Sequence, residues 1–186
     1  MRGVSDDVSV LVLEDETELL DAYVKGLSEA YDVIPAASGD DAIETIDELG
    51  DDLDVALLDR RLPDSSGDEV LKHIQSWSID CRTAMVTAVD PTFDIIDMGF
   101  DDYVIKPVTP SDLRSVIERL LVLDEYDEIY RQLSEKRVKQ SVLAAEKSRA
   151  ELRSNDEYRR LSTEIEELEA QLESIETEIE DTPLPH

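Results

Sequence analysis

Short apolar runs, each ending in a polar residue, most constrain the fold of this chain. Val55-Ala56-Leu57-Leu58 is too short for a helix and ends at Asp59, so we predict a buried strand there. Pro63 and Gly67 then indicate a loop. Four further runs of the same character predict the other strands. They are residues 8–13, ending at Glu14-Asp15; residues 31–36, near an edge because of Pro35; residues 82–86, ending at Thr87; and residues 103–105, ending at Lys106-Pro107.

Between these runs, apolar residues recur at helical spacing. The clearest helix start is Thr109, a capping residue, followed by Pro110 at the first helical position. Five strands alternating with five helices predict an α/β fold, a doubly wound (βα)5 parallel sheet covered on both faces. The strand order of flavodoxin-like sheets, 2-1-3-4-5, is the one we expect. The apolar helix positions are Leu19, Leu20, Tyr23, Val24 and Leu27; Ala42, Ile43, Ile46 and Leu49; Val70, Leu71 and Ile74; and Leu113, Val116, Ile117, Leu120 and Leu121.

Three carboxylates should meet at one edge of this sheet. Glu14, Asp15 and Asp59 follow the first and third strands, which are neighbours in the expected order. Carboxylates so close repel one another unless a cation neutralises them, and Mg²⁺ prefers oxygen ligands and phosphate. Lys106 adds a positive charge and Thr87 a hydroxyl group. An aspartate in such a setting can attack phosphorus and form an acyl phosphate.

The same strand ends carry a resemblance to a known family. The chain resembles the receiver domain of two-component response regulators over residues 8 to about 123, through the acidic pair, the strand before Asp59, Pro63, Gly67, Thr87-Ala88 and Tyr103 ahead of Lys106-Pro107. The resemblance implies that a sensor histidine kinase phosphorylates Asp59. The implied roles are metal ligands for Glu14, Asp15, Asp59 and the backbone carbonyl of Arg61; switch and phosphate-binding residues for Thr87, Ala88 and Tyr103; phosphate partner for Lys106; and a structural role for Pro107 after a cis peptide bond.

Enzyme classes that share parts of this chemistry lack support in the sequence. Haloacid-dehalogenase-like phosphatases need a second aspartate two residues after the nucleophile, and position 61 is arginine. No Gly-x-Gly-x-x-Gly follows the first strand, so dinucleotide binding is unsupported. Neither His73 nor His186 has neighbours that suggest a triad or a metal site. We expect a phosphoacceptor signalling protein and not an enzyme. Arg60 and Arg61 are less usual after the acceptor, and their side chains can affect access of water or phosphodonor.

Residues 124–182 should form a separate helical domain. They contain no glycine, and a first helix carries Tyr126, Ile129, Tyr130, Leu133, Val138, Val142 and Leu143. A second helix should begin at Ser154, which has capping-box spacing to Glu157. Its apolar residues have a strict 3.5-residue period, which predicts packing against one partner helix. An antiparallel hairpin within the chain and an intermolecular coiled coil both satisfy this pattern. The apolar positions are Tyr158, Leu161, Ile165, Leu168, Leu172, Ile175 and Ile179.

This second region resembles the HalX domain, a helical module that follows receivers in regulators of salt-adapted archaea. The similarity covers roughly residues 124–180 and includes the segments 144–148 and 157–161. We therefore expect a receiver over residues 1–123, a HalX-like domain over 124–182 and a short tail over 183–186.

Charge is distributed very unevenly along the chain. Eighteen basic residues against 47 acidic ones give a net charge of −29, which molar salt would screen, so a salt-adapted cytoplasm is expected. Residues 131–160 hold nine Lys/Arg against five Asp/Glu, whereas residues 161–186 hold no basic residue against nine acidic ones. Parallel self-pairing of the second helix would place its acidic flanks Glu164, Glu169, Glu176 and Glu178 together. Pairing with the more basic first helix, or screening by salt, removes that repulsion.

The basic segment does not by itself indicate DNA binding. Its nine basic residues are interleaved with acids, and no helix-turn-helix, zinc finger or ribbon motif is present. A homodimer or another helix-pairing partner is the favoured output, and DNA is a partner that no motif supports. The expected role is in transcription regulation; a stand-alone phosphorelay or protein-interaction adaptor without DNA binding is the alternative. The single Cys81 fits a reducing compartment. No signal peptide and no apolar stretch of ~20 residues is present, so a cytoplasmic protein without a membrane partner is expected.

Overall fold

The computed structural model describes residues 8–63 and 66–181, and the expected tail at 183–186 lies outside them. The chain divides into two compact units, with the division after Leu121. Within the described residues, no helix combines the length and the apolarity needed to cross a membrane.

The first unit is built on a five-stranded parallel sheet in the order β2-β1-β3-β4-β5, which confirms the expected topology. All of β1 and all of β3 are buried, as their continuous apolar sequences predict for strands covered on both faces. β2 is more exposed and lies at an edge, where Pro35 costs no ladder bond. The strands are β1 Ser9–Leu13, β2 Asp32–Ala36, β3 Val55–Leu58, β4 Arg82–Thr87 and β5 Asp102–Ile105.

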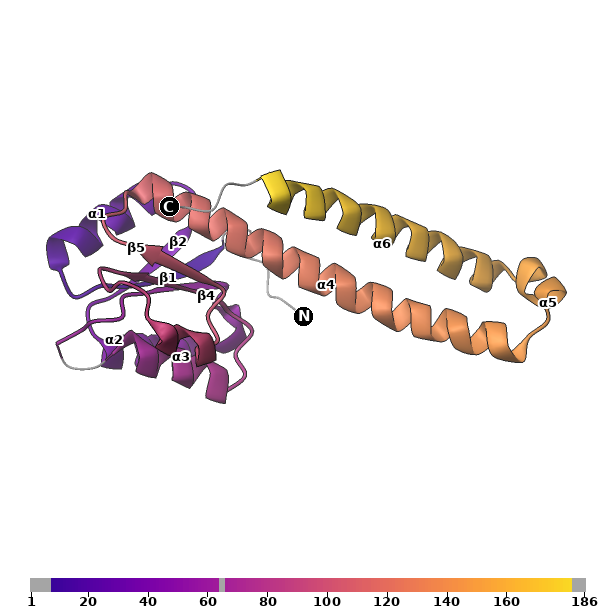
Figure 1. Cartoon of the computed structure of the whole chain (residues 1–186), viewed down its shortest axis with the longest axis horizontal. Helices are drawn as coiled ribbons and strands as arrows, with labels where there is room; N and C mark the ends of the chain where they lie inside the picture. Colours follow the sequence, from indigo (N-terminus) through magenta and orange to yellow (C-terminus); the bar gives the residue numbers. More distant parts are fainter. Residues whose placement is uncertain (1–7, 64–65, 182–186) are drawn as a thin grey trace. The chain divides into compact units, whose positions relative to one another are not determined.

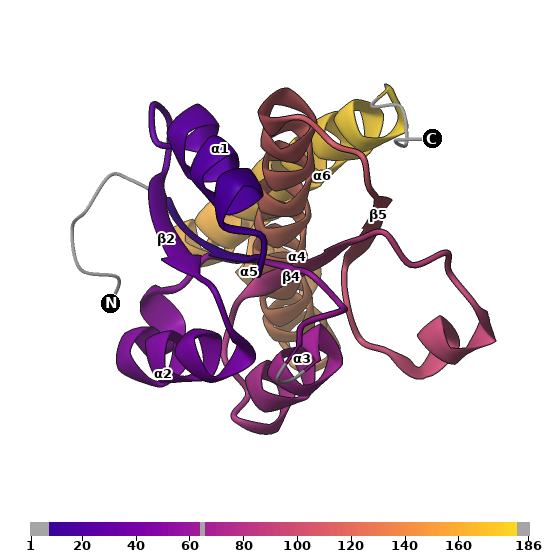
Figure 2. The ribbon, with the colours of Figure 1, turned by 90° about the vertical axis from the view of Figure 1, so that its left-hand side faces the viewer.

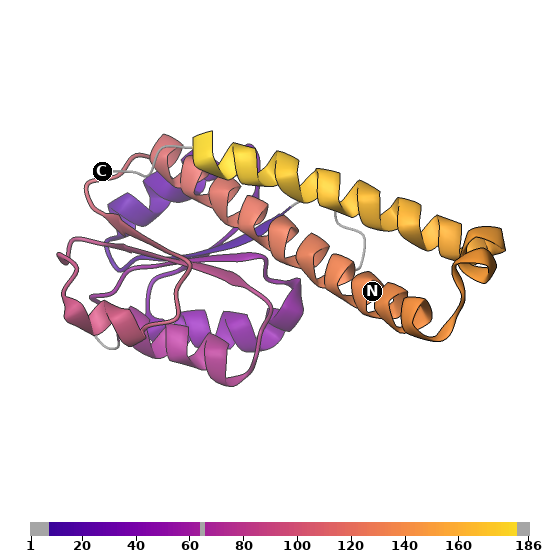
Figure 3. The same cartoon turned by 45° about the vertical axis from the view of Figure 1, so that its right-hand side comes forward.

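Helices cover both faces of this sheet (Figure 3). On one face, α1 (Thr17–Leu27) and the first turns of α4 (Pro110–Glu146) pack against alternate strand residues such as Val10 and Leu57. On the other face, α2 (Gly39–Leu49) and α3 (Gly67–Ser76) pack against residues such as Leu11 and Leu58. The alternation of side chains along each strand therefore supplies two separate cores, one on each side of the sheet.

Side-chain caps fix where the helices of this unit begin. Thr109 caps α4 as expected: its hydroxyl accepts a hydrogen bond from the Asp112 amide at 3.2 Å. Ser66 and Glu69 form a capping box at the start of α3. The capping box fixes the start of α3, and this start is also the end of the loop that begins at Asp59.

The expectation of five helices alternating with five strands is wrong in one place. Between β4 and β5 the structure has only a five-residue 3₁₀ helix, η2 (Phe93–Asp97), the short pink helix at the lower right of Figure 2. Pro91 and Gly99 bracket this short segment, and both residues disfavour a longer helix. Phe93 is 91% exposed, so the segment also lacks the buried apolar face that stabilises helices by packing. A second short 3₁₀ helix, η1 (Gly50–Asp52), precedes β3.

The second unit is an antiparallel helical hairpin (Figure 1). It consists of α4 from residue 122 onward, α5 (Arg149–Ser154) and α6 (Asp156–Asp181). The 3.5-residue stripe of α6 packs against α4 residues on the same chain, so the hairpin alternative is the one observed. Its buried residues are Ile129 and Leu133 of α4 with Ile165, Leu168, Leu172 and Ile175 of α6.

The expected cap of the last helix lies one residue off. Ser154 belongs to α5, and its hydroxyl donates to the Glu151 carbonyl at 3.0 Å. Asn155 caps α6 instead, because its Oδ1 accepts from the Tyr158 amide at 2.8 Å. A capping box of Ser148 and Glu151 starts an additional short helix, α5, which ends at Ser154. Ser154 is therefore the last residue of α5 and not the cap of α6.

Opposite charges face each other along the hairpin. Lys136 Nζ lies 2.6 Å from Glu164 and Arg137 lies 2.7 Å from Glu169. Tyr126 donates a hydrogen bond to Glu176 at 3.1 Å. The acidic flanks of α6 are therefore matched by α4, as the charge distribution predicted. These pairs are largely exposed, so each contributes little stability by itself and the apolar stripe dominates.

We predict that two adjacent α6 positions respond very differently to alanine. Leu172 is 8% exposed within the hairpin core, whereas Gln171 is exposed. Leu172→Ala should destabilise the hairpin by about 2–3 kcal/mol through lost burial and a residual cavity, and Gln171→Ala by less than about 0.5 kcal/mol. Urea titration followed by far-UV circular dichroism measures both. Equal effects of the two changes would show that the stripe is not a packed core.

Candidate functional site

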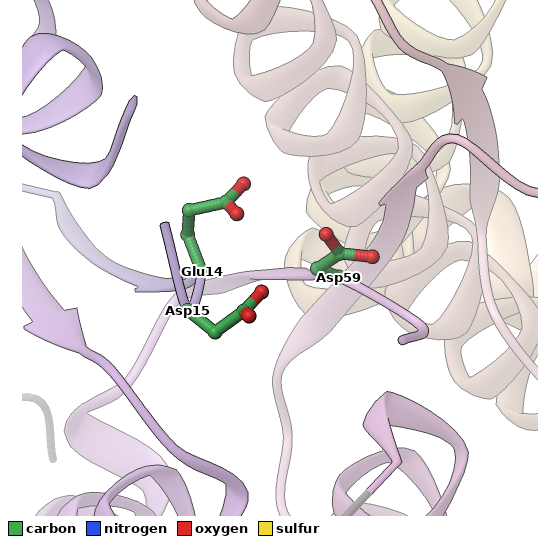
Figure 4. A group of neighbouring side chains, drawn as sticks. All are labelled: Glu14, Asp15 and Asp59. Atoms are coloured by element: carbon green, nitrogen blue, oxygen red, sulfur yellow. The ribbon is translucent and has the colours of Figure 1, made fainter. Parts of the chain in front are cut away.

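Three carboxylates converge at the carboxyl ends of β1 and β3 (Figure 4). The register pairs Leu13 with Leu58, so Glu14 and Asp59, the next residue of each strand, reach the same edge together. One carboxylate oxygen from each of Glu14, Asp15 and Asp59 lies within 4.8 Å of the others. Glu14 is 3% exposed and Asp59 7% exposed, while Asp15 faces solvent. Two carboxylates of the cluster are thus buried, and the third is accessible to solvent.

Lys106, directly after β5, forms ion pairs with the two buried carboxylates. Its Nζ lies 2.5 Å from Glu14 Oε2 and 2.5 Å from Asp59 Oδ2. Burial alone would lower the pKa of Lys106, but hydrogen bonds to Asp59 and Glu14 outweigh it and leave this pKa above its ordinary value. The ammonium group therefore stays charged across the physiological range and links strand ends that are far apart in sequence.

The backbone around Asp59 holds its carboxylate in one orientation. The Arg61 amide donates to Asp59 Oδ1 at 3.1 Å, while the other oxygen, Oδ2, faces Lys106. Gly67 approaches so closely that a Cβ there would lie 2.2 Å from the Asp59 carbonyl oxygen. Only glycine fits at this position without moving the loop. The expected carbonyl of Arg61 belongs to this same loop, next to the cluster in sequence.

Thr87 and Ala88 end the neighbouring strand β4. Thr87 is fully buried, and its hydroxyl oxygen accepts a hydrogen bond from the Val89 amide at 3.3 Å. Its carbonyl accepts from the Lys106 amide at 2.9 Å, which ties the ends of β4 and β5 together. Among the described residues, no hydrogen bond joins the Thr87 hydroxyl to the carboxylates. The structure thus brings Thr87 beside Lys106 but not into contact with Asp59.

Tyr103 and Pro107 occupy the two ends of β5. The Tyr103 ring is partly buried against Phe100, with ring centroids 5.4 Å apart, and its hydroxyl donates to the Val89 carbonyl at 2.8 Å. Thr87 and Tyr103 therefore bind the two backbone groups of one residue, Val89. The peptide bond between Lys106 and Pro107 is cis, as the resemblance implied.

Tyr23 of α1 is a neighbour of the site that sequence patterns missed. It is 2% exposed, and its hydroxyl is buried without a hydrogen-bond partner among the described residues. Burial raises the Tyr23 pKa, the Lys106 charge opposes this, and Glu14 and Asp59 raise it further. The charges of the cluster thus act on this hydroxyl. The available signal was a tyrosine on the apolar face of a helix, since a buried hydroxyl normally requires a polar partner.

Arg60 forms a network beside the acceptor whose partners were also not foreseen. Its Nε lies 3.1 Å from Asp68 of α3, and Nη2 pairs with Asp94 of η2. The hydrogen bond to Asp94 raises the pKa of Arg60, burial opposes it, and a hydrogen bond to Tyr103 adds to the increase. The same pair lowers the pKa of Asp94. The guanidinium group therefore links α3 and η2 beside Asp59.

The donor set fits a hard divalent cation. Carboxylate oxygens are the ligands that Mg²⁺ prefers, and an ion bound at ~2.1 Å accommodates oxygens up to ~4.2 Å apart. The clustered oxygens of Glu14, Asp15 and Asp59 nearly meet that limit already. Asp15 opens the cluster to solvent, which leaves room for water and phosphate oxygens in the coordination shell. The unpartnered hydroxyl of Tyr23 marks a further polar group near these charges.

Two family profiles match this chain. The profile of the response regulator receiver domain matches residues 10–118, and the profile of the HalX domain matches residues 122–183.

Two curated relatives show how the matched part occurs in longer proteins. A "Putative transcriptional regulator" of Haloferax volcanii is 42% identical over 119 residues, 63% of this chain and 20% of that protein. A cyclic di-GMP phosphodiesterase of Thermotoga maritima is 34% identical over 150 residues, 77% of this chain and 39% of that protein. The chain thus spans between a fifth and two fifths of these relatives, and they differ in the activity that their names describe.

Solved structures share the fold of the first unit. A CheY-like receiver domain from Methanospirillum hungatei has a TM-score of 0.59 at 29% identity, covering 66% of this chain and 99% of that one. The response regulator TrrA of Thermotoga maritima, in complex with Mg²⁺ and beryllofluoride, has a TM-score of 0.55 at 25% identity, covering 61% of this chain and 98% of that one. The chain belongs to the response regulator receiver family, and its receiver is followed by a HalX domain.

Proposed function

We propose that Asp59 accepts a phosphoryl group from the phosphohistidine of a sensor kinase, in a reaction that requires Mg²⁺. The observation that carries this proposal is the convergence of Glu14, Asp15 and Asp59 with Lys106 at the carboxyl edge of the sheet. The complex of TrrA with Mg²⁺ and beryllofluoride supports the same use of this fold. The receiver is taken to span residues 1–123 and the HalX-like domain residues 124–182.

Each residue of the cluster has a distinct part in the transfer. The Arg61 amide holds one oxygen of Asp59, which leaves the other oxygen, now beside Lys106, to attack phosphorus. An O–P bond forms while the P–N bond of the donor breaks, and its electron pair returns to the imidazole nitrogen. The Lys106 ammonium stabilises the negative charge on the transferring group. Mg²⁺, held by Glu14, Asp15, Asp59 and the Arg61 carbonyl, supplies further charge neutralisation.

Thr87 and Tyr103 are proposed to change their hydrogen bonds when Asp59 is phosphorylated. A phosphoryl group on Asp59 offers new acceptor oxygens to the Thr87 hydroxyl and to the Ala88 amide. Because Thr87 and Tyr103 both bind the backbone of Val89, a movement of Thr87 changes the groups available to the Tyr103 hydroxyl. Arg60, which holds η2 through Asp94, limits how far this segment moves.

The second unit is proposed to be the output of this switch, acting in transcription regulation through pairing with a second copy. The name of the Haloferax volcanii relative supports the transcriptional role. A direct DNA contact is less favoured, since acidic residues are interleaved with the basic ones and the sequence has no DNA-binding motif. A net charge of −29 supports a salt-adapted cytoplasm as the setting. The alternative remains a phosphorelay or protein-interaction adaptor that does not bind DNA.

We predict that Asp59→Ala abolishes phosphorylation by phosphoramidate, a small donor with a P–N bond. Mass spectrometry should find one added phosphoryl group on the wild type, removable by hydroxylamine as an acyl phosphate is, and none on the variant. Asp32→Ala is the matched control, because Asp32 lies at the start of β2, away from the carboxyl edge. An Asp59→Ala protein that still gains a hydroxylamine-labile phosphoryl group would contradict the assignment.

We predict that Lys106→Met raises the affinity for Mg²⁺ while it slows phosphorylation. A divalent ion and an ammonium group about 5 Å apart repel each other by roughly 2 kcal/mol even at the dielectric constant of water, so the gain should be on the order of tenfold. Isothermal titration calorimetry measures it. Lys25→Met, at the exposed end of α1, removes the same charge elsewhere and should leave the affinity unchanged. Weaker binding to Lys106→Met would argue against an ion beside Lys106.

We predict that mimicking phosphorylation changes the pairing of the second unit. Addition of Mg²⁺ and beryllofluoride should shift the molar mass measured by light scattering at fixed protein concentration, because α4 carries residues of both units. Asp59→Ala should give no shift. If the wild type has the same mass with and without the mimic, the switch does not act through pairing.

A further inference from the structure

The second unit has an apolar surface that its own hairpin does not use. Among the described residues of this unit, the exposed large hydrophobic side chains are Tyr130, Val138, Val142 and Leu143, at 55%, 64%, 59% and 37% exposure. All four lie on α4, and none lies on α6. The hairpin core uses different α4 positions, such as Leu133, which is 3% exposed. These α4 side chains are therefore exposed outside the hairpin core, and the Tyr130 ring stacks on Tyr126 with the ring centroids 6.3 Å apart.

Three of these residues form a ridge with i, i+4 spacing. Tyr130, Ser134, Val138 and Val142 follow one another at four-residue intervals, so they form a continuous row on the helix surface, here named the α4 ridge. Ser134 is small and exposed, which leaves a gap in the row between the larger side chains of Tyr130 and Val138. A row of this kind fits against another helix.

The charge pattern of α4 indicates which helix that is. Within α4, residues 122–135 contain five acidic residues and one basic residue, a net charge of −4, whereas residues 136–146 contain three basic residues and one acidic residue, a net charge of +2. Two copies of this segment in antiparallel orientation place each acidic half against the other copy's basic half. A parallel pair would instead set like charges together. The segment is thus complementary to itself in one orientation only.

We propose that the α4 ridge binds the α4 ridge of a second copy of this chain, antiparallel, with the two-fold axis near residue 136. In this register Tyr130 lies opposite Val142 of the second copy, and Ser134 opposite Val138. Such a contact is isologous, so each pair occurs twice and the assembly closes as a dimer. The proposal specifies the partner surface of the second unit and rests on the proposed homodimer, but not on phosphorylation of Asp59.

Neighbouring charges and a groove support this register. It brings Glu135 near Lys139 of the second copy. Lys139 has no ion-pair partner within 4 Å in the described part of the chain, so its charge is available for this contact. Val138 and Val142 also line a groove of about 820 Å³, together with Leu143, Leu152, Tyr158 and Leu161. Tyr130 of the second copy lies at its mouth, and buried aromatic anchors of this kind dominate many interfaces.

Cysteine cross-linking tests the orientation in the full-length chain. With Cys81 replaced by serine, a mixture of Tyr130→Cys and Val142→Cys proteins should form a disulfide-linked dimer under mild oxidation. Each variant alone should not, because residues 130 of the two copies would lie about 18 Å apart along the axis and a disulfide needs Cα atoms within ~7 Å. Cross-linking of each variant with itself, or none in the mixture, would overturn the antiparallel register.

A second measurement tests whether the ridge holds the dimer. Sedimentation equilibrium in molar KCl should give a dimer for the wild type. Val138→Glu combined with Val142→Glu should raise the dimer dissociation constant by roughly a hundredfold. Gln171→Glu combined with Ser174→Glu adds the same charge to exposed α6 positions and should leave the dimer intact.

The remaining outcomes of this measurement count against the proposal. A wild-type monomer at the highest soluble concentration would leave the ridge to a helix of another protein. Equal dissociation of both glutamate variants would show that net charge, and not the ridge, decides the association. Equal retention of the dimer in both variants would place the interface elsewhere. Phosphorylation of Asp59 would stand in each of these cases.

Discussion

Repulsion between buried carboxylates is the constraint on which the site depends. The parallel register of β1 and β3 forces Glu14 and Asp59 to the same edge, where both are almost fully buried. Two such charges are tolerable only with a compensating cation nearby. Lys106 provides it from β5, three strands away from β1 in the sheet. Three carboxylates and one ammonium group still leave a net charge of −2, so the site attracts a divalent cation without being rebuilt.

Most of the first unit could be predicted from the sequence because each strand is recognisable from its own residues. Uninterrupted apolar runs require burial on both faces, which only a parallel sheet with helices on each side supplies. The missed feature was the segment between β4 and β5, where Phe93 and Ile96 stay exposed and a short 3₁₀ helix replaces the expected helix. Alternation of elements predicts a crossover there, but only packing decides whether that crossover becomes a helix. The same limit applies to α5, a single short helix that depends on its capping box.

The site residues that could be predicted are those whose place follows from the strand order; the residues that were missed depend on contacts between distant side chains. Residues such as Asp59 and Lys106 end strands, so their meeting follows from the topology. The partners of Arg60 and the position of Tyr23 depend on side chains from separate helices and loops. No spacing in the sequence encodes these contacts. Tyr23 in particular has the pattern of a core residue, and only its unpartnered hydroxyl in the folded unit distinguishes it.

The uneven charge of the chain has a structural consequence beyond solubility. Nine of its 18 basic residues lie within residues 131–160, where α6 supplies acidic partners for Lys136 and Arg137. Salt that screens the excess of acids also weakens these exposed pairs, so they select the partner and its orientation more than they add stability. Apolar contacts must then hold the helices together, and salts that strengthen burial favour them. A helix with a buried seam toward α6 and an exposed apolar ridge elsewhere is suited to association under those conditions.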